Sequence, residues 1–131
     1  EARELLLQAL EIAPDNGNTL HALGLLETRS GSTDKALEYL GKAAAVETMG
    51  IRHRFVYAIA LHDLGQPAEA VQALQKLLQQ VPGNEQVLLA LANYNAELGN
   101  KAEARRYAQQ LVKGNPGNNN YKQLLQSLQG P

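Results

Sequence analysis

The sequence predicts an all-α fold in which antiparallel helix pairs stack into a solenoid of about eight helices. Three observations support this fold class. Leu and Ala supply most of the apolar residues, which favours helices over strands. Glycines recur at an interval of 34 residues, at Gly31, Gly65 and Gly99. Apolar helical patterns precede and follow each of these glycines, so each one marks a turn between two helices.

Composition narrows the classes of function. The 131 residues are 44% hydrophobic and 19% charged, as expected for one globular domain. The net charge of −1 predicts no binding to nucleic acid, and the longest apolar run, 87–92, is too short to insert into a membrane. Cys is absent, which excludes thiolate metal ligands and haem attachment through C-x-x-C-H within this stretch. We therefore expect a soluble protein of either the cytoplasm or the periplasm.

The 34-residue period extends to further columns of residues. Four further sets of residues recur every 34 positions. One set is all Ala, a second is Gly or Ala, a third is Pro with one exception, and a fourth is Asn with one exception. These columns are Ala2, Ala36, Ala70 and Ala104; Gly24, Ala58 and Ala92; Pro14, Pro82 and Pro116, with Thr48 at the remaining position; and Asn16, Asn84 and Asn118, with Gly50 at the remaining position. Their agreement predicts an internal repeat.

Each column has a physical role in a helix pair. Gly can take the left-handed conformation that ends a helix, and Asn16 and its equivalents can cap the next helix. Pro67 suits the first turn of a helix, and Asn100 with Glu103 predicts a capping box. The small residues at Gly24 and its equivalents let two helices approach closely.

The repeat unit is therefore two antiparallel helices joined by a tight turn. The predicted helices span 1–13, 17–30, 33–47, 51–64, 67–80, 84–98, 101–113 and 119–129. We interpret the whole chain, 1–131, as a single solenoid. Its parts are 1–16 as the second helix of a truncated repeat, full repeats at 17–50, 51–84 and 85–118, and an amphipathic capping helix at 119–131.

The columns contain the residues that mark a known family. They are Leu20, Leu23, Gly24, Gly31, Ala36, Leu40 and Ala43 in the first full repeat, Ala58, Leu61, Gly65, Ala70, Leu74 and Pro82 in the second, and Leu88, Leu91, Ala92, Gly99, Ala104 and Pro116 in the third. This pattern resembles the tetratricopeptide repeat family over essentially the whole chain, which implies a right-handed superhelix. Departures are Thr48 at the position of a Pro, Arg54 at that of a large apolar residue, and Glu27 and Asn95 at that of an aromatic residue.

Residues with catalytic or metal-binding chemistry are present but do not form a motif. His21, His53 and His62 lack the spacing of metal ligands. His62 and Asp63 are neighbours, and adjacent helix residues point about 100° apart, so we expect no shared face. No serine lies in a nucleophile motif. We therefore predict no enzyme activity, no metal and no cofactor.

The resemblance implies an inner groove lined by the first helix of each pair, which binds segments of other proteins. The positions that correspond to this groove are Asn18, His21, Leu25 and Arg29 in the first repeat, Arg52, Phe55, Ile59 and His62 in the second, and Gln86, Leu89, Asn93 and Glu97 in the third.

The predicted helix at 51–64 is apolar on two sides. Phe55 and Ile59 form a stripe with His62 that is separate from the face expected to pack inward. One interpretation is that a central helix of a solenoid contacts neighbours on both flanks. The other is an apolar floor for a ligand, edged by Arg29, Arg52 and His62.

Two functions follow from these expectations. The first is a protein-interaction scaffold that binds a peptide or partner protein in the groove. The second is an assembly module that packs against other parts of its own larger protein. A weaker resemblance of 54–74 to repeat segments of bacterial proteins with upstream multihaem cytochrome domains implies a periplasmic version of this module. Leu5, Leu6 and Leu7 would lack a preceding helix, so we also expect further repeats before 1 or self-association through this edge.

Overall fold

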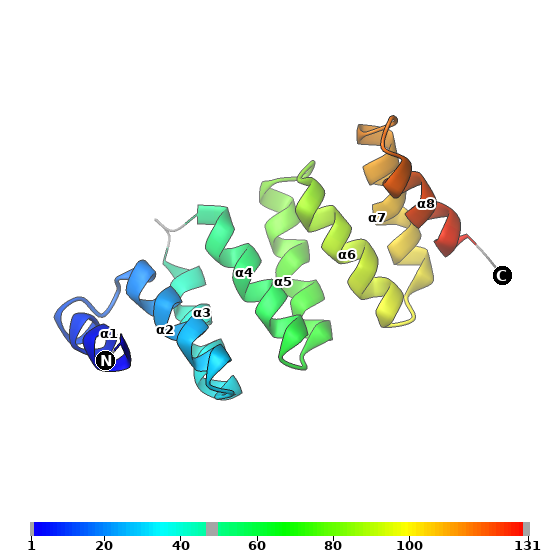
Figure 1. The fold of residues 1–131 in the computed structure, drawn as a ribbon. Coiled ribbons are helices and arrows are strands. Elements are labelled where there is room, and N and C mark those ends of the chain that lie inside the picture. The colour runs from blue at the N-terminus through cyan, green and yellow to red at the C-terminus, as the bar shows by residue number, and fades with distance from the viewer. Residues whose placement is uncertain (1, 47–49, 130–131) are drawn as a thin grey trace. The chain divides into compact units, whose positions relative to one another are not determined.

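The computed structural model describes residues 2–46 and 50–129 and is all-α over these residues (Figure 1). The helices are α1 (Ala2–Ile12), α2 (Gly17–Arg29), α3 (Thr33–Ala45), α4 (Gly50–Asp63), α5 (Pro67–Gln80), α6 (Glu85–Glu97), α7 (Lys101–Gly114) and α8 (Asn119–Leu128). Each predicted helix is confirmed, with ends that differ from the prediction by no more than two residues. Thr48, the exception in the Pro column, lies outside the described residues.

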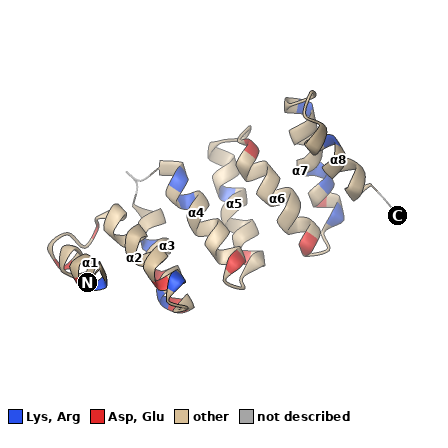
Figure 2. Ribbon diagram, in the orientation of Figure 1, with Lys and Arg blue, Asp and Glu red and all other residues tan. Residues whose placement is uncertain are grey.

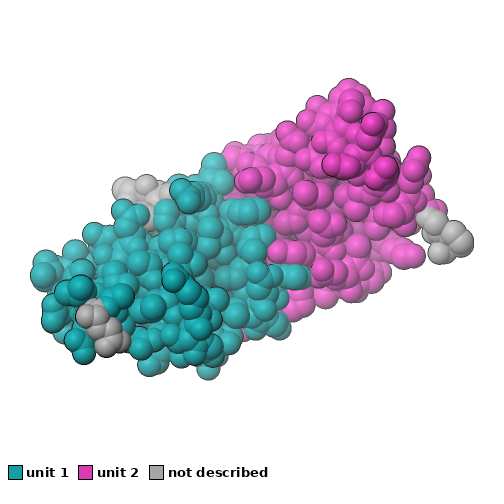
Figure 3. Space-filling model, in the orientation of Figure 1, with its two compact units in different colours: residues 1–65 teal, residues 66–131 magenta. Residues whose placement is uncertain are grey.

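The helices fall into two compact units, 1–65 and 66–131 (Figure 3). In the first unit, α1 packs on α2, α2 on α3, and α3 on α4. In the second unit, α5 packs on α6, α6 on α7, and α7 on α8. Consecutive helices are therefore neighbours in space within each unit, as expected for stacked helix pairs.

The predicted helix ends are confirmed at most positions. The side chains of Asn16, Asn84 and Asn118 each accept a hydrogen bond from the backbone N–H three residues later, at 3.0–3.1 Å. The φ angles of the glycine column are 81° at Gly31 and 83° at Gly99, in the left-handed region that ends a helix. The repeat period therefore reports the points at which the chain turns.

The predicted capping box at Asn100 is wrong. The side chain of Asn100 makes no capping bond to the backbone, and its ψ angle is 67°, whereas the asparagines that do cap have ψ angles of 105–117°. Its amide instead donates to Oδ1 of Asn95 at 3.5 Å. Glu103 accepts a hydrogen bond from Arg106 at 2.8 Å. A capping box needs both side chains directed at the backbone, and neither is.

The small-residue columns form the contacts between helices. Ala36, Ala70 and Ala104 are fully buried. A Cβ atom added at Gly24 would lie 2.5 Å from Cδ2 of Leu40 and 3.2 Å from its backbone nitrogen. Since Leu40 is itself buried in α3, α2 can approach α3 this closely only without a side chain at Gly24.

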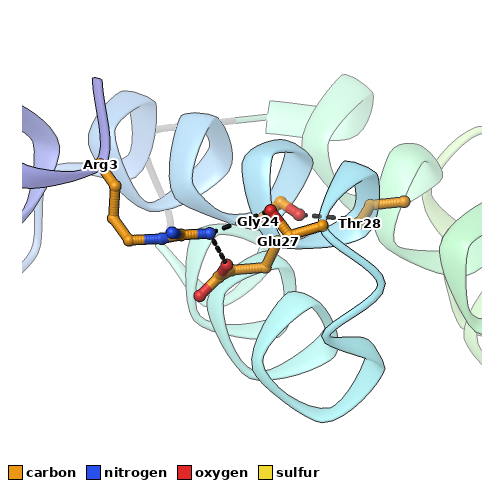
Figure 4. A network of polar contacts seen from close by, with 5 residues as sticks. Arg3, Gly24, Glu27 and Thr28 are labelled. Carbon is orange, nitrogen blue, oxygen red and sulfur yellow. Dashed lines mark hydrogen bonds and ion pairs between the residues drawn. The ribbon is translucent and has the colours of Figure 1, made fainter. Parts of the chain in front are cut away.

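Two polar residues occupy the positions where the family has an aromatic residue, and each has a partner. Glu27 is only 5% exposed, and its Oε1 accepts a hydrogen bond from Arg3 of α1 at 2.8 Å (Figure 4). The same guanidinium donates to Ser30 at 2.9 Å. Asn95 is 2% exposed and donates to the carbonyl of Leu91 at 2.8 Å. Because each buried polar group is hydrogen-bonded, the departures from the family pattern do not disrupt the packing.

We expect Gly24→Ala to destabilise the protein by about 1–2 kcal/mol. Overpacking against Leu40 costs about 1–3 kcal/mol, and the better helix propensity of Ala offsets up to about 1 kcal/mol of this. Urea unfolding measures the change. Gly114→Ala in α7 is the matched control, because no atom lies within 4 Å of its added Cβ and its stability should be equal or slightly higher. Equal stability of both variants would contradict the close packing of α2 on α3.

Candidate functional site

An apolar pocket of about 340 Å³ lies between α2, α3 and α4, within the first unit. Seven of its nine lining residues are apolar, and the lining consists of Leu25, Thr28, Leu40, Phe55, Val56, Ile59, Ala60, Asp63 and Leu64. The structure thus brings together three residues of the predicted groove, Leu25, Phe55 and Ile59. This pocket is the candidate functional site.

Helix α3 packs closely against both α2 and α4, and the pocket lies between these two helices. Leu40 of α3 forms the floor, and it is buried because Gly24 lets α2 lie close to α3. On the other side, a Cβ atom at Gly41 would lie 3.3 Å from the ring of Tyr57, so α4 also approaches α3 closely. The walls are residues of α2 and α4 that point away from these contacts and stay partly exposed to solvent.

Two histidines lie in the first half of α2 and of α4, outside the pocket lining. The rings of His21 in α2 and His53 in α4 meet edge to face, with centroids 4.6 Å apart. Burial, followed by the charges of His53 and Arg52, holds the pKa of His21 below its ordinary value. Figure 2 shows Lys and Arg positions, in blue, on the first turns of α4, where Arg52 and Arg54 lie, so positive charge gathers at this end. The sequence did not reveal this pairing, because the two histidines lie 32 residues apart, off the repeat period.

The pocket carries a carboxylate near the C-terminal end of α4. Asp63 lines the pocket at the last residue of α4, and its side chain is 63% exposed. The expectation that His62 and Asp63 share no face is wrong at this point, since Nδ1 of His62 lies 2.9 Å from Oδ1 of Asp63. Both residues lie in the last turn of α4, so the contact joins two neighbouring side chains at the end of the helix.

The remaining predicted groove residues differ in their surroundings. Asn18, Arg29 and Arg52 are exposed in the first unit. In the second unit, the predicted residues follow one side of α6, where Leu89 is half-buried and the other three, Gln86, Asn93 and Glu97, are exposed.

Sequence reasoning missed six of the nine lining residues, and a continued helical spacing would have found four of them. Val56, Ala60 and Asp63 follow each other at intervals of four and three residues, next to the stripe of Phe55 and Ile59. Thr28 lies in the same way three residues after Leu25. The helical spacing of these residues was visible in the sequence. The prediction used only one stripe of each helix, whereas the pocket is lined by two adjacent stripes.

Two other hollows are features of the repeat rather than specific sites. One is lined by Pro14, Asp15, Leu20, Lys42, Ala45 and Val46, and the other by Pro82, Gly83, Glu85, Leu88, Gln110, Lys113, Gly114 and Asn115. All six residues of the first correspond to residues of the second two periods of 34 later in the sequence. A hollow that recurs in the same register follows from the turn geometry of the helix pair.

In the part of the chain that the structure describes, no group of three or more His, Cys, Asp or Glu side chains could hold a metal ion. Among the same residues, none of the helices has the length and apolar character that a membrane span requires.

Comparison with known proteins agrees with the geometry. The tetratricopeptide repeat family matches residues 61–128 and, through a second family description, residues 21–85. A 40-residue stretch is 50% identical to Protein CTR9 homolog of Arabidopsis thaliana, and the match spans 30% of this chain but only 4% of that protein.

Solved structures show the same fold. A crystal structure of MamA has a TM-score of 0.78 at 20% identity, over 94% of this chain and 72% of that one. A second MamA structure is 29% identical with a TM-score of 0.73, over 88% of this chain and 63% of that one. A tetratricopeptide repeat protein from Parabacteroides merdae has a TM-score of 0.81 at 22% identity, over 97% of this chain and 52% of that one.

The fold and its columns define a helical-repeat protein of antiparallel helix pairs, and these matches confirm the predicted helical solenoid. The chain belongs to the tetratricopeptide repeat family, because the matched residues 61–128 are more than half of it. Membership of this family indicates a protein-interaction scaffold, and the fold is generally non-catalytic.

Proposed function

We propose that this scaffold binds a segment of a partner protein in the pocket between α2 and α4. The observation that carries the proposal is the convergence of Leu25, Phe55 and Ile59 on one apolar pocket. The second interpretation of the α4 stripe, an apolar floor for a ligand, is therefore the one we favour. The groove residues of the second unit, Gln86, Leu89, Asn93 and Glu97, stay a prediction from the family resemblance.

The energetic argument rests on incomplete burial. Leu25 is 38% exposed, and Phe55 and Ile59 are only half-buried, so a partner side chain in the pocket would remove apolar surface from water. Full burial of one large apolar side chain contributes about 1.5–3 kcal/mol. A few such anchors carry most of the free energy of a protein interface.

We expect the double variant Phe55→Ala and Ile59→Ala to lose a partner that the unaltered chain captures. Both side chains are partly exposed, so the thermal melt followed by circular dichroism should change much less than the binding does. Leu7→Ala combined with Ile12→Ala is the matched control, because it removes exposed apolar side chains from α1 instead. Retention of the captured partner by the pocket variant would show that the proposal is wrong.

The assembly function has an observation of its own at α1. Leu5 is 64% exposed and Ile12 is 86% exposed. In the repeat register, Leu6 corresponds to Leu40 and Leu74, which are at most 2% exposed, whereas Leu6 itself is only half-buried. One face of α1 is therefore less covered than the same face of α3 and α5. This supports self-association through the α1 edge, or packing against other repeats of a larger protein.

A chain of copies joined head to tail is the less favoured form of this assembly. In the repeat register, α8 would be the helix that precedes α1 of the next copy, and Gln126 of α8 occupies the position of Gly24. Since Gly24 admits no side chain against Leu40, Gln126 would hold the next copy's α1 away. The α1 edges of two copies are then the surfaces left to pair. The periplasmic, multihaem-cytochrome-linked version stays a prediction from the weaker resemblance.

Sedimentation velocity tests the assembly function. If it is correct, the protein should associate with rising concentration, and Leu5→Glu should abolish this association by placing a charge in the apolar contact. Lys122→Glu on the exposed face of α8 is the control and should leave the association unchanged. A monomer at every concentration would rule out self-association.

A further inference from the structure

We infer that the pocket recognises an extended segment of another protein with the pattern acidic–x–apolar–x–basic. The apolar residue would enter the pocket, the acidic residue would face the start of α4, and the basic residue would face Asp63. This inference rests on the proposed function and adds the chemistry of the partner. Three features of the first unit support it, one for each position of the pattern.

The apolar position follows from the shape of the lining. The apolar walls include Leu25, Phe55 and Ile59, and the floor is Leu40. Only two lining residues, Thr28 and Asp63, are polar. One pocket admits one anchoring side chain. A helical partner would instead present several anchors at intervals of three to four residues along a longer apolar groove, whereas this lining carries polar residues, Thr28 and Asp63, toward the C-terminal end of α4.

The acidic position follows from the charges at the start of the helices. Arg52 is exposed in the first turns of α4, and His21 and His53 meet beside it. The positive end of the α4 dipole adds to this potential. Arg52 is also close enough to His21 to affect its protonation, so the two belong to one electrostatic environment. A carboxylate of the partner would be attracted here and a cation repelled.

The basic position follows from Asp63. It is the charged residue of the pocket lining, and its exposed carboxylate lies at the negative, C-terminal end of α4. Thr28 of α2 adds a hydroxyl to the same end of the lining. A cation of the partner would therefore be favoured here, which gives the two ends of α4 opposite electrostatic preferences.

The distance between the two ends sets the length of the pattern. Arg52 and Asp63 are 11 residues apart in α4, which corresponds to about 16 Å at 1.5 Å per residue. An extended segment advances about 3.3 Å per residue, so four residues cover about 13 Å and long charged side chains cover the rest. Alternate residues of an extended segment point to the same side, which places all three key side chains toward the groove.

The probe is a fluorescein-labelled peptide with the core Glu-Ser-Leu-Ser-Lys, prepared in both chain directions and titrated into the whole chain by fluorescence anisotropy. We expect at least one direction to bind. Replacing its Leu by Ala should weaken binding about tenfold, because an apolar anchor is lost. Replacing its Lys by Glu should weaken binding about two- to fivefold, as should raising the salt concentration.

The variant Asp63→Lys makes the test specific to the proposed orientation. It should reverse the preference, so that the peptide with Glu in place of Lys binds better than the original. Asp63→Asn is the milder variant and should remove the preference without reversing it. Both changes are at an exposed helix C-terminus, where a cation is tolerated, and circular dichroism checks the fold.

The possible contrary results distinguish a failure of the charge pattern from a failure of binding in the pocket. Binding that needs Phe55 and Ile59 but ignores the charges would overturn this inference and leave the proposed function standing. The same holds if no probe peptide binds while a captured partner still depends on Phe55 and Ile59. Probe binding that persists in the Phe55→Ala and Ile59→Ala variant would overturn both the inference and the proposed function.

Discussion

The close contact between Gly24 of α2 and Leu40 of α3 is the constraint on which the candidate site depends. Leu40 is at once the residue against which α2 packs and the floor of the pocket. A side chain at Gly24 would move α2 and widen the space in which Leu25 lies. In the third repeat the corresponding positions hold Ala92 and Ala108, both fully buried, so a larger residue on the first helix is matched by a smaller one on the second. The packing of α2 on α3 therefore also determines the shape of the pocket.

The sequence predicted the helices and their turns well because both depend on local chemistry. A glycine that ends a helix and an asparagine that caps the next act within a few residues, and a fixed period repeats these signals. Asn100 was predicted wrongly because its amide is directed to Asn95, a buried residue of the preceding helix. The hydrogen bond between Asn100 and Asn95, which the turn between α6 and α7 allows, took the place of the expected bond from the side chain of Asn100 to the backbone of α7.

The site could be predicted only in part, because its geometry depends on distances between helices. Leu25, Phe55 and Ile59 were found because the family places groove residues at those positions. The meeting of His21 with His53 and the position of Asp63 in the lining follow from how α2 and α4 lie beside each other on α3. Helical periodicity gives the face of each helix but not the partner of a side chain on the next one.

The most direct test of the account maps where a bound partner touches the chain. A ¹⁵N-labelled sample titrated with a captured partner segment would show which backbone amide resonances change. The account predicts that the largest changes lie on α2 and α4, at and around Leu25, Phe55 and Ile59. Changes confined to α1 or α8, with α2 and α4 unaffected, would contradict it and favour the edge of the repeat array as the binding surface.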